Sequence, residues 1–323
     1  MTTTPPDLET AEEPLIPGPY TGVKFGRGDR IFSGVALASG LTILVTLAAV
    51  FIFLLIKGFP GFSADPEIFA PSSDNFWSYV GKLLFGTTLA AIVALIIAVP
   101  FSLALALFIS HYAPRRIATP VAYIIDLLAA VPSVVFGLWG ARTLAVASQP
   151  MQRWLDDNLG WLPFFHGPAS ATGRTILIAG LVLAIMCIPI ITAICREVFA
   201  QTPRLHEEAA LALGATRWEM VRYAVFPHSR SGMVAGIMLG LGRALGETMA
   251  VAMVMSSTPI VTLNLISSTN PATIASNIAS NYKAEDNRIQ TVLLATGLVL
   301  FLFTFLVNFA ARYIAGKGEG SDK

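Results

Sequence analysis

Three charged side chains, Asp126, Arg243 and Glu247, lie inside long apolar stretches of this 323-residue chain. A charge near the centre of a bilayer costs roughly 2.5–3.5 kcal/mol even on the most lenient scale, so such residues usually serve a function. A guanidinium group binds phosphate-like oxyanions through paired N–H donors. We predict that Arg243 attracts a permeant anion, that Glu247 neutralises Arg243 when the site is empty, and that both line or gate a pathway. The alternative is that Arg243 and Glu247 pair only as a structural staple. Asp126 either pairs with Arg243 or faces the pathway.

Arg243 and Glu247 continue a stripe of glycines. Gly232, Gly236, Gly240, Arg243 and Glu247 are separated by four, four, three and four positions, so a single helix would present all of them on one face. Small residues at this spacing let membrane helices approach closely. The two charges are therefore expected to face protein rather than lipid.

The elements that must hold these residues are membrane helices. The chain is 54% hydrophobic and 13% charged, whereas soluble domains carry about 25% charged residues. Helices satisfy their own backbone in a bilayer, and the alternation typical of a membrane barrel is absent. The sequence predicts an all-α membrane protein with six runs of spanning length, at residues 31–56, 83–110, 117–139, 175–195, 231–255 and 289–311.

The distribution of lysine and arginine orients these runs. With the N- and C-termini in the cytoplasm, most basic residues of the connecting segments lie on the cytoplasmic side, as the positive-inside rule requires. The resulting layout is a cytoplasmic tail at residues 1–30, a six-span domain at 31–315 with a long cytoplasmic loop at 196–230, and a short cytoplasmic tail at 316–323. The N-terminal tail is rich in Pro, Thr and Glu and is expected to be disordered.

The cytoplasmic loop has the pattern of two short helices joined at a glycine. Residues 205–213 favour a helix by composition, and Gly214 is a typical helix stop. Residues 217–225 then give a second helix with one apolar face. Such a unit could project from the membrane into a cleft on a cytoplasmic partner.

This loop resembles the coupling loop in the membrane subunits of ATP-binding-cassette (ABC) importers, whose motif is E-A-A-x3-G-x9-I-x-L-P. The matching residues are Glu208, Ala209, Ala210, Gly214 and Pro227, while Ala224 and Phe226 replace the Ile and Leu of the motif. The resemblance implies a type I ABC importer permease fold. It also implies that an ATPase docks on Glu208, Ala209, Ala210, Gly214 and Arg217.

Two further segments resemble the permeases of phosphate-specific importers, which act in the bacterial cytoplasmic membrane. They are Gly-Arg-Ala-Leu-Gly-Glu-Thr-Met-Ala-Val at 242–251, whose ending is similar to the PstC type, and Ala-Val-Pro-Ser-Val-Val-Phe-Gly-Leu at 130–138. The resemblance implies a second homologous permease of the PstA type, two cytoplasmic ATPases of the PstB type and an extracytoplasmic phosphate-binding protein of the PstS type. ATP and Mg²⁺ would then bind to the ATPases, and this chain would bind no cofactor.

Enzymatic interpretations find little support. The chain lacks the G-x-x-x-x-G-K-[ST] phosphate loop, so ATP is expected to be hydrolysed by another subunit. His206 and Glu207 begin like a zinc protease motif, but Ala210 stands where the second histidine is needed, so no metal site is predicted. The remaining alternatives are a permease for another oxyanion, such as molybdate or sulfate, and a secondary transporter or channel that works without a motor.

Overall fold

The computed structural model describes residues 26–69, 73–256, 258–283 and 286–317. All regular elements in these residues are helices, which confirms the all-α prediction. The chain divides into two compact units, Met1–Val50 and Phe51–Lys323. The described part of the first unit is essentially the N-terminal portion of helix α1 (Arg27–Gly58), and the functional elements lie in the second. The tails predicted at 1–30 and 316–323 lie largely outside the described residues, and the last residues of the first belong to α1.

Four described helices are long and apolar enough to cross a membrane, or five if one bent helix pair counts as a single crossing. The four are α1, α2 (Phe76–Leu107), α6 (Ile176–Ala200) and α12 (Asn287–Lys317). Helix α9 (Phe226–Gly246), which holds Arg243, is not among them, because its arginines and glycines lower its hydropathy. The predicted number of six spans therefore stays a prediction.

Two of the predicted spans are not continuous helices. In the run 117–139, α3 (Arg115–Ala129) ends before Pro132 and α4 (Ser133–Trp139) begins after it. The helical stretch Ser133–Leu159, which α4 opens, is bent by 91° from α3. Proline lacks an N–H and disfavours helical backbone in the residue before it, which explains this break. In the run 231–255, α9 ends at Gly246, Glu247 has extended backbone angles (φ −69°, ψ 126°), and α10 (Met249–Val254) follows.

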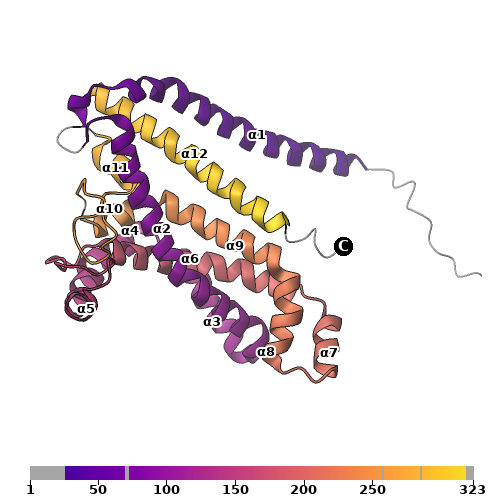
Figure 1. Ribbon diagram of the computed structural model, residues 1–323. Coiled ribbons are helices and arrows are strands. Elements are labelled where there is room, and N and C mark those ends of the chain that lie inside the picture. Colours follow the sequence, from indigo (N-terminus) through magenta and orange to yellow (C-terminus); the bar gives the residue numbers. More distant parts are fainter. Residues whose placement is uncertain (1–25, 70–72, 257, 284–285, 318–323) are drawn as a thin grey trace, which may run out of the picture. The chain divides into compact units, whose positions relative to one another are not determined.

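Helix α6 is the centre of the second unit and packs along α2 on one side and α9 on another (Figure 1). The contact with α9 depends on the predicted glycine stripe. A β-carbon built at Gly240 would lie 2.7 Å from side-chain carbons of Ile191, and one at Gly236 would lie 3.1 Å from Ile194. The Cys187 thiol donates a hydrogen bond to the Gly240 carbonyl at 3.3 Å. Small residues therefore bring the α9 backbone directly onto α6, as predicted.

The two ends of this unit carry different short elements (Figure 1). At one end lie α7 (Arg204–Ala212), α8 (Arg217–Met220) and the π-helical turn η5 (Val221–Val225), together with the π-helical turn η3 (Phe108–Tyr112) that ends α2. At the other end lie α4, α10, α5 (Ala145–Leu159) and α11 (Ile274–Asn281). Helix α2 runs between them, so it connects the two ends directly.

The glycine stripe yields a stability prediction. At Gly232 an added β-carbon would lie 2.5 Å from both γ-carbons of Val198, a side chain with little rotamer freedom. We expect Gly232→Ala to destabilise the protein by about 1–3 kcal/mol through overpacking, measured as a lower melting temperature in detergent. Gly242→Ala on the same helix is the matched control, because an added β-carbon there meets nothing within 4 Å. Equal melting temperatures for the two variants would contradict close packing of α6 on α9.

Candidate functional site

The first candidate site is the hairpin α7–Gly214–α8, here called the coupling segment (residues 203–227). Helix α7 ends in a Schellman motif, in which the Ala215 N–H donates to the Ala210 carbonyl at 3.2 Å and the Gly214 N–H donates to the Leu211 carbonyl at 3.0 Å. Gly214 has φ +85°, a left-handed conformation that glycine adopts without cost. Ala210 and Gly214 are thus spaced so that they end the helix in a C-cap, after which the chain reverses direction.

The second helix of the coupling segment begins with a capping box. The Glu219 N–H donates to the Thr216 hydroxyl oxygen at 3.3 Å, and the Thr216 N–H donates to the Glu219 carboxylate at 2.7 Å. Hydrogen bonds from the Thr216 backbone and hydroxyl lower the pKa of Glu219. Arg217 is exposed in the first turn of α8, while Val221 and Val225 of the following turn are fully buried. One face of the hairpin is therefore anchored in the protein core.

The other face of the coupling segment exposes large apolar side chains. Leu213 is 90% exposed, Leu205 74% and Trp218 54%. Glu208 and Ala209 are also exposed, whereas Ala210 packs against the hydrophobic core. Large apolar side chains that stay exposed among polar residues are common at protein–protein contacts. Glu208, Ala209, Gly214 and Arg217 are thus accessible to a partner, and Ala210 orients the helix from beneath.

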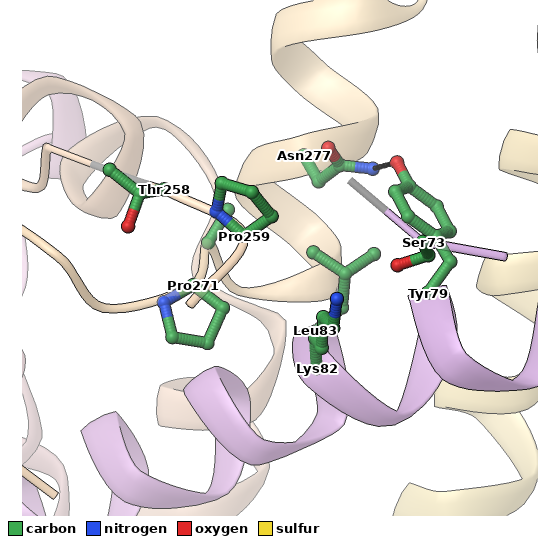
Figure 2. Close-up of a pocket in the computed structure, with 9 residues that line it drawn as sticks. Ser73, Tyr79, Lys82, Leu83, Thr258, Pro259, Pro271 and Asn277 are labelled. Atoms are coloured by element: carbon green, nitrogen blue, oxygen red, sulfur yellow. Dashed lines mark hydrogen bonds between the residues drawn. The ribbon is translucent and has the colours of Figure 1, made fainter. Parts of the chain in front are cut away.

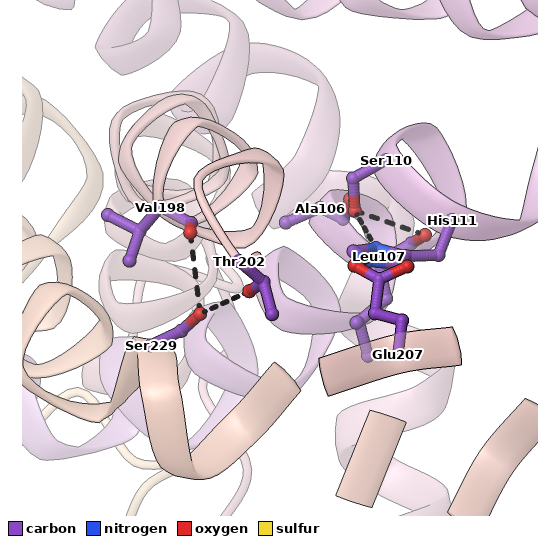
Figure 3. Close-up of polar contacts among 8 residues, drawn as sticks. All are labelled: Ala106, Leu107, Ser110, His111, Val198, Thr202, Glu207 and Ser229. Carbon is purple, nitrogen blue, oxygen red and sulfur yellow. Dashed lines mark hydrogen bonds and ion pairs between the residues drawn. The ribbon is translucent and has the colours of Figure 1, made fainter. Parts of the chain in front are cut away.

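Two sets of polar contacts lie at the coupling segment and beside it (Figure 3). His111 Nε2, at the end of α2, lies 3.4 Å from Glu207 Oε1 on α7, and its Nδ1 lies 2.7 Å from the Ser110 hydroxyl. On the other side, the buried Ser229 hydroxyl of α9 lies 3.4 Å from the Thr202 hydroxyl and donates to the Val198 carbonyl of α6 at 3.4 Å. A displacement of α7 would therefore act on α2 through His111, whereas Thr202 and Ser229, which flank the coupling segment in the sequence, join α6 to α9. Residue spacing could not indicate this partner, because Glu207 lies 96 positions from His111 in the chain.

The His111–Glu207 contact can be tested by hydrogen exchange. Glu207→Gln removes the charged partner, and a hydrogen bond to a charged group contributes about 1.5–3 kcal/mol, less where the carboxylate keeps 23% of its surface exposed. We expect amides of α7 to exchange at least about fivefold faster in this variant, by mass spectrometry of the purified protein. Glu208→Gln is the matched control, because Glu208 has no hydrogen bond or ion pair to any described residue. Similar exchange in both variants would show that the contact does not hold α7.

The second candidate site surrounds Arg243. This residue lines an open cavity of about 990 Å³ between α6, α9 and α12, and its buried Nε has no hydrogen-bond partner among the described residues. Buried donors are normally paired, so this nitrogen is a candidate for binding a water, a ligand or a group of a neighbouring subunit. Ser231, Asn308 and Arg312 add polar groups to the lining. Asn308 and Arg312 were missed by sequence reasoning, because α12 reads as a plain apolar span.

Glu247 does not pair with Arg243, contrary to both interpretations drawn from the sequence. Ion pairs within 4.0 Å among the described residues are His111–Glu207, Arg196–Asp126 and Arg288–Asp65. The four-residue spacing of a helix is lost because α9 ends at Gly246. Glu247 is buried, and its Oε1 accepts a hydrogen bond from the Ala250 N–H at 3.2 Å, so it caps the first turn of α10.

Asp126 also has a different partner from the one expected. Its Oδ2 lies 3.9 Å from Nη2 of Arg196 on α6, and both residues line a separate cavity of about 310 Å³ between α3 and α6. Pairing of Asp126 with Arg243 was therefore wrong, and a pathway role for Asp126 stays a prediction. The sequence assigned Arg196 to the cytoplasmic loop, but α6 continues to Ala200 and places Arg196 on the helix.

Comparison with solved structures gives the class of the protein. A chain of a bacterial ABC transporter involved in the import of the acidic polysaccharide alginate superposes with a TM-score of 0.53 at 14% identity, over 89% of this chain and 99% of that one. This similarity shows the fold, which is that of type I ABC importer permeases. The chain thus has the fold of an ABC importer permease.

Sequence comparison gives the family. The profile of the family described as "Binding-protein-dependent transport system inner membrane component" matches residues 98–317. Phosphate transport system permease protein PstC 2 of Mycobacterium tuberculosis is 47% identical over 301 residues, which cover 90% of this chain and 92% of the relative. The PstC protein of Mycobacterium leprae is 42% identical over 300 residues, covering 90% and 94%. The chain therefore belongs to the binding-protein-dependent transport permease family, with PstC permeases as relatives, and is a multi-pass protein of the bacterial inner membrane.

Proposed function

We propose that this chain is the subunit of an ATP-driven importer that translocates inorganic phosphate across the cytoplasmic membrane. The observation that carries the proposal is the 47% identity over nine-tenths of the chain to a protein named as a phosphate transport permease. The cavity of Arg243 supports it, since a guanidinium with an unpaired Nε can bind phosphate oxygens through two N–H donors.

The complex we propose contains three other kinds of subunit. A second, homologous permease of the PstA type completes the membrane part, and two PstB-type ATPases bind ATP and Mg²⁺ in the cytoplasm. A PstS-type binding protein delivers phosphate on the opposite side. In this arrangement the present chain binds no cofactor, crosses the membrane six times and keeps both termini in the cytoplasm.

The coupling segment is the site at which we propose that the ATPase acts. Leu213 and Trp218 offer an exposed apolar surface, and Glu208 and Arg217 are exposed charges beside it. Movement of α7 is transmitted through His111 to α2, and through the chain on either side of the coupling segment to α6 and α9, which Thr202 and Ser229 join. Because α9 carries Arg243, this movement changes the surroundings of the guanidinium. ATP binding and hydrolysis thereby bias the bundle between two conformations.

The test is transport by the purified complex in proteoliposomes that contain ATP and the binding protein. We expect uptake of radiolabelled phosphate that requires ATP and is not reduced by excess sulfate or molybdate. Competition by either anion, with transport of that anion, would assign the chain to another oxyanion. Full uptake without ATP would indicate a secondary transporter or channel and would overturn the proposal.

A further inference from the structure

A second polar cavity lies at the end of the bundle opposite the coupling segment. It has a volume of about 200 Å³ and is enclosed by the start of α2, the segment before α11, and α11 itself. Figure 2 shows Tyr79 and Lys82 of α2 on one side and Thr258, Pro259 and Pro271 on the other, with Asn277 of α11 above. We call it the outer pocket; its lining residues are Ser73, Tyr79, Lys82, Leu83, Thr258, Pro259, Pro271, Ala272 and Asn277.

The walls of the outer pocket are fixed to one another by close contacts. A β-carbon at Gly86 of α2 would lie 2.5 Å from the Pro271 carbonyl oxygen, so α2 approaches this segment with no side chain between them. The Thr87 hydroxyl oxygen accepts a hydrogen bond from the Ile274 N–H at 3.0 Å, which fixes the start of α11. The pocket is therefore built into the fold.

The chemistry of the outer pocket suits an anion. The Asn277 amide donates to the Tyr79 hydroxyl oxygen at 2.7 Å, which leaves the Tyr79 O–H to donate to another group. Lys82 contributes an ammonium, and none of the lining residues is acidic. Lys82 and Ser73 also interact with other protein groups, but an ammonium with three donors can serve a protein partner and an anion together. A water molecule takes about 30 Å³ of liquid, so the pocket has room for a hydrated tetrahedral oxyanion.

The outer pocket also adjoins a smaller cavity that leads to α10. This cavity, of about 80 Å³, shares Ala272 and Asn277 with the outer pocket and reaches Val251 and Met255. Val251 belongs to the helix that Glu247 caps, and α9 with Arg243 lies directly before it. The two cavities therefore adjoin each other between the start of α2 and α10.

We propose that the outer pocket holds inorganic phosphate through Lys82 and Tyr79 after its arrival from outside and before it passes inward. This inference rests on the proposed function, because that function places this end of α2 on the extracytoplasmic side and makes phosphate the substrate. Lys82 supplies the charge that attracts the anion, and Tyr79, oriented by Asn277, supplies a directed O–H donor. The site concentrates phosphate at the outer end of the bundle.

The experiment is protection of a thiol at the pocket wall in the reconstituted complex. Ala272→Cys places a small thiol on the lining, and the native Cys187 and Cys195 are buried, so the parent protein gives the background. We expect millimolar phosphate to slow modification of A272C by a membrane-impermeant reagent at least threefold, while chloride of equal ionic strength does not. Lys82→Gln should abolish this protection and Lys82→Arg should keep it. Lys283→Gln, an exposed lysine whose ammonium lies over the Tyr282 ring, is the matched control and should also keep it.

Absence of protection by phosphate, equal protection by chloride, or full protection in Lys82→Gln would each overturn the inference. If Lys82→Gln does not assemble with the ATPase, the inference is tested by the modification rates of A272C in phosphate and in chloride, measured in the variant that keeps Lys82. Failure of the proposed function has a different signature, because the parent complex would then not take up phosphate with ATP. If the complex transports phosphate but phosphate does not protect A272C, only the inference about the outer pocket is contradicted.

Discussion

Arg243→Ala is expected to lower ATP-driven phosphate uptake by about 10- to 100-fold. A hydrogen bond to a charged group contributes about 1.5–3 kcal/mol, and Arg243 can offer phosphate two such bonds from the wall of its cavity. Glu247 caps α10 and does not neutralise Arg243, so the variant removes an attraction without releasing a partner carboxylate. The initial rate of radiolabelled phosphate uptake in proteoliposomes measures the effect.

Two further variants separate binding from general damage. Arg243→Lys keeps the charge but loses the paired donors, so its uptake should lie between the parent and the alanine variant. Arg288→Ala removes an arginine whose ion pair with Asp65 is exposed at 3.4 Å and is worth little, so its uptake should match the parent. Parent-level uptake by Arg243→Ala would assign this residue to structure alone.

Gly214→Asp should reduce uptake to less than a tenth of the parent rate while the protein still inserts and assembles in the membrane. Gly214 lies in open space at φ +85°, so a side chain there meets nothing within the chain and projects from the hairpin turn. Asp tolerates left-handed backbone better than most residues, so the helix reversal survives. The new carboxylate instead sits where we propose that the ATPase binds. Uptake and ATP hydrolysis by the same preparation measure the loss of coupling.

Gly214→Asn is the matched variant, because it has nearly the same shape and backbone tolerance without the charge. We expect it to retain more uptake than Gly214→Asp. A Gly214→Asp complex that transports at the parent rate would argue against contact between this turn and a partner. Loss of the protein from the membrane in both variants would point to folding, which thermal melting of the detergent-solubilised chain reports independently.

Local sequence signals predicted the coupling segment well. Helix formers followed by Gly214 gave α7 and its end, because a Schellman motif depends on residues within one turn of each other. The long apolar runs of α2, α6 and α12 were equally clear, since their composition allows no other structure in a bilayer. The glycine stripe on α9 predicted a close helix contact, although the sequence did not identify α6 as the neighbour.

The breaks and the charge partners could not be predicted in the same way. Both predicted runs stay apolar across Pro132 and Glu247, so hydropathy predicts one continuous span in each. In the structure the helix bends at Pro132 and ends before Glu247. The partner of Asp126 is Arg196 of α6, and the partner of His111 is Glu207, 96 positions away in the chain. Such pairs are set by how helices pack against each other, and residue spacing along one helix says nothing about them.

Helix α2 is an unbroken 32-residue element, about 48 Å long at 1.5 Å per residue. Tyr79 and Lys82 lie near one tip, and His111 follows directly after the other. If α2 shifts as a rigid body, anion binding at one end is coupled to ATPase binding at the other. Such a coupling free energy acts equally in both directions. Binding of substrate at the outer end would then change the affinity of the chain for the ATPase by the same factor by which the ATPase changes its affinity for substrate.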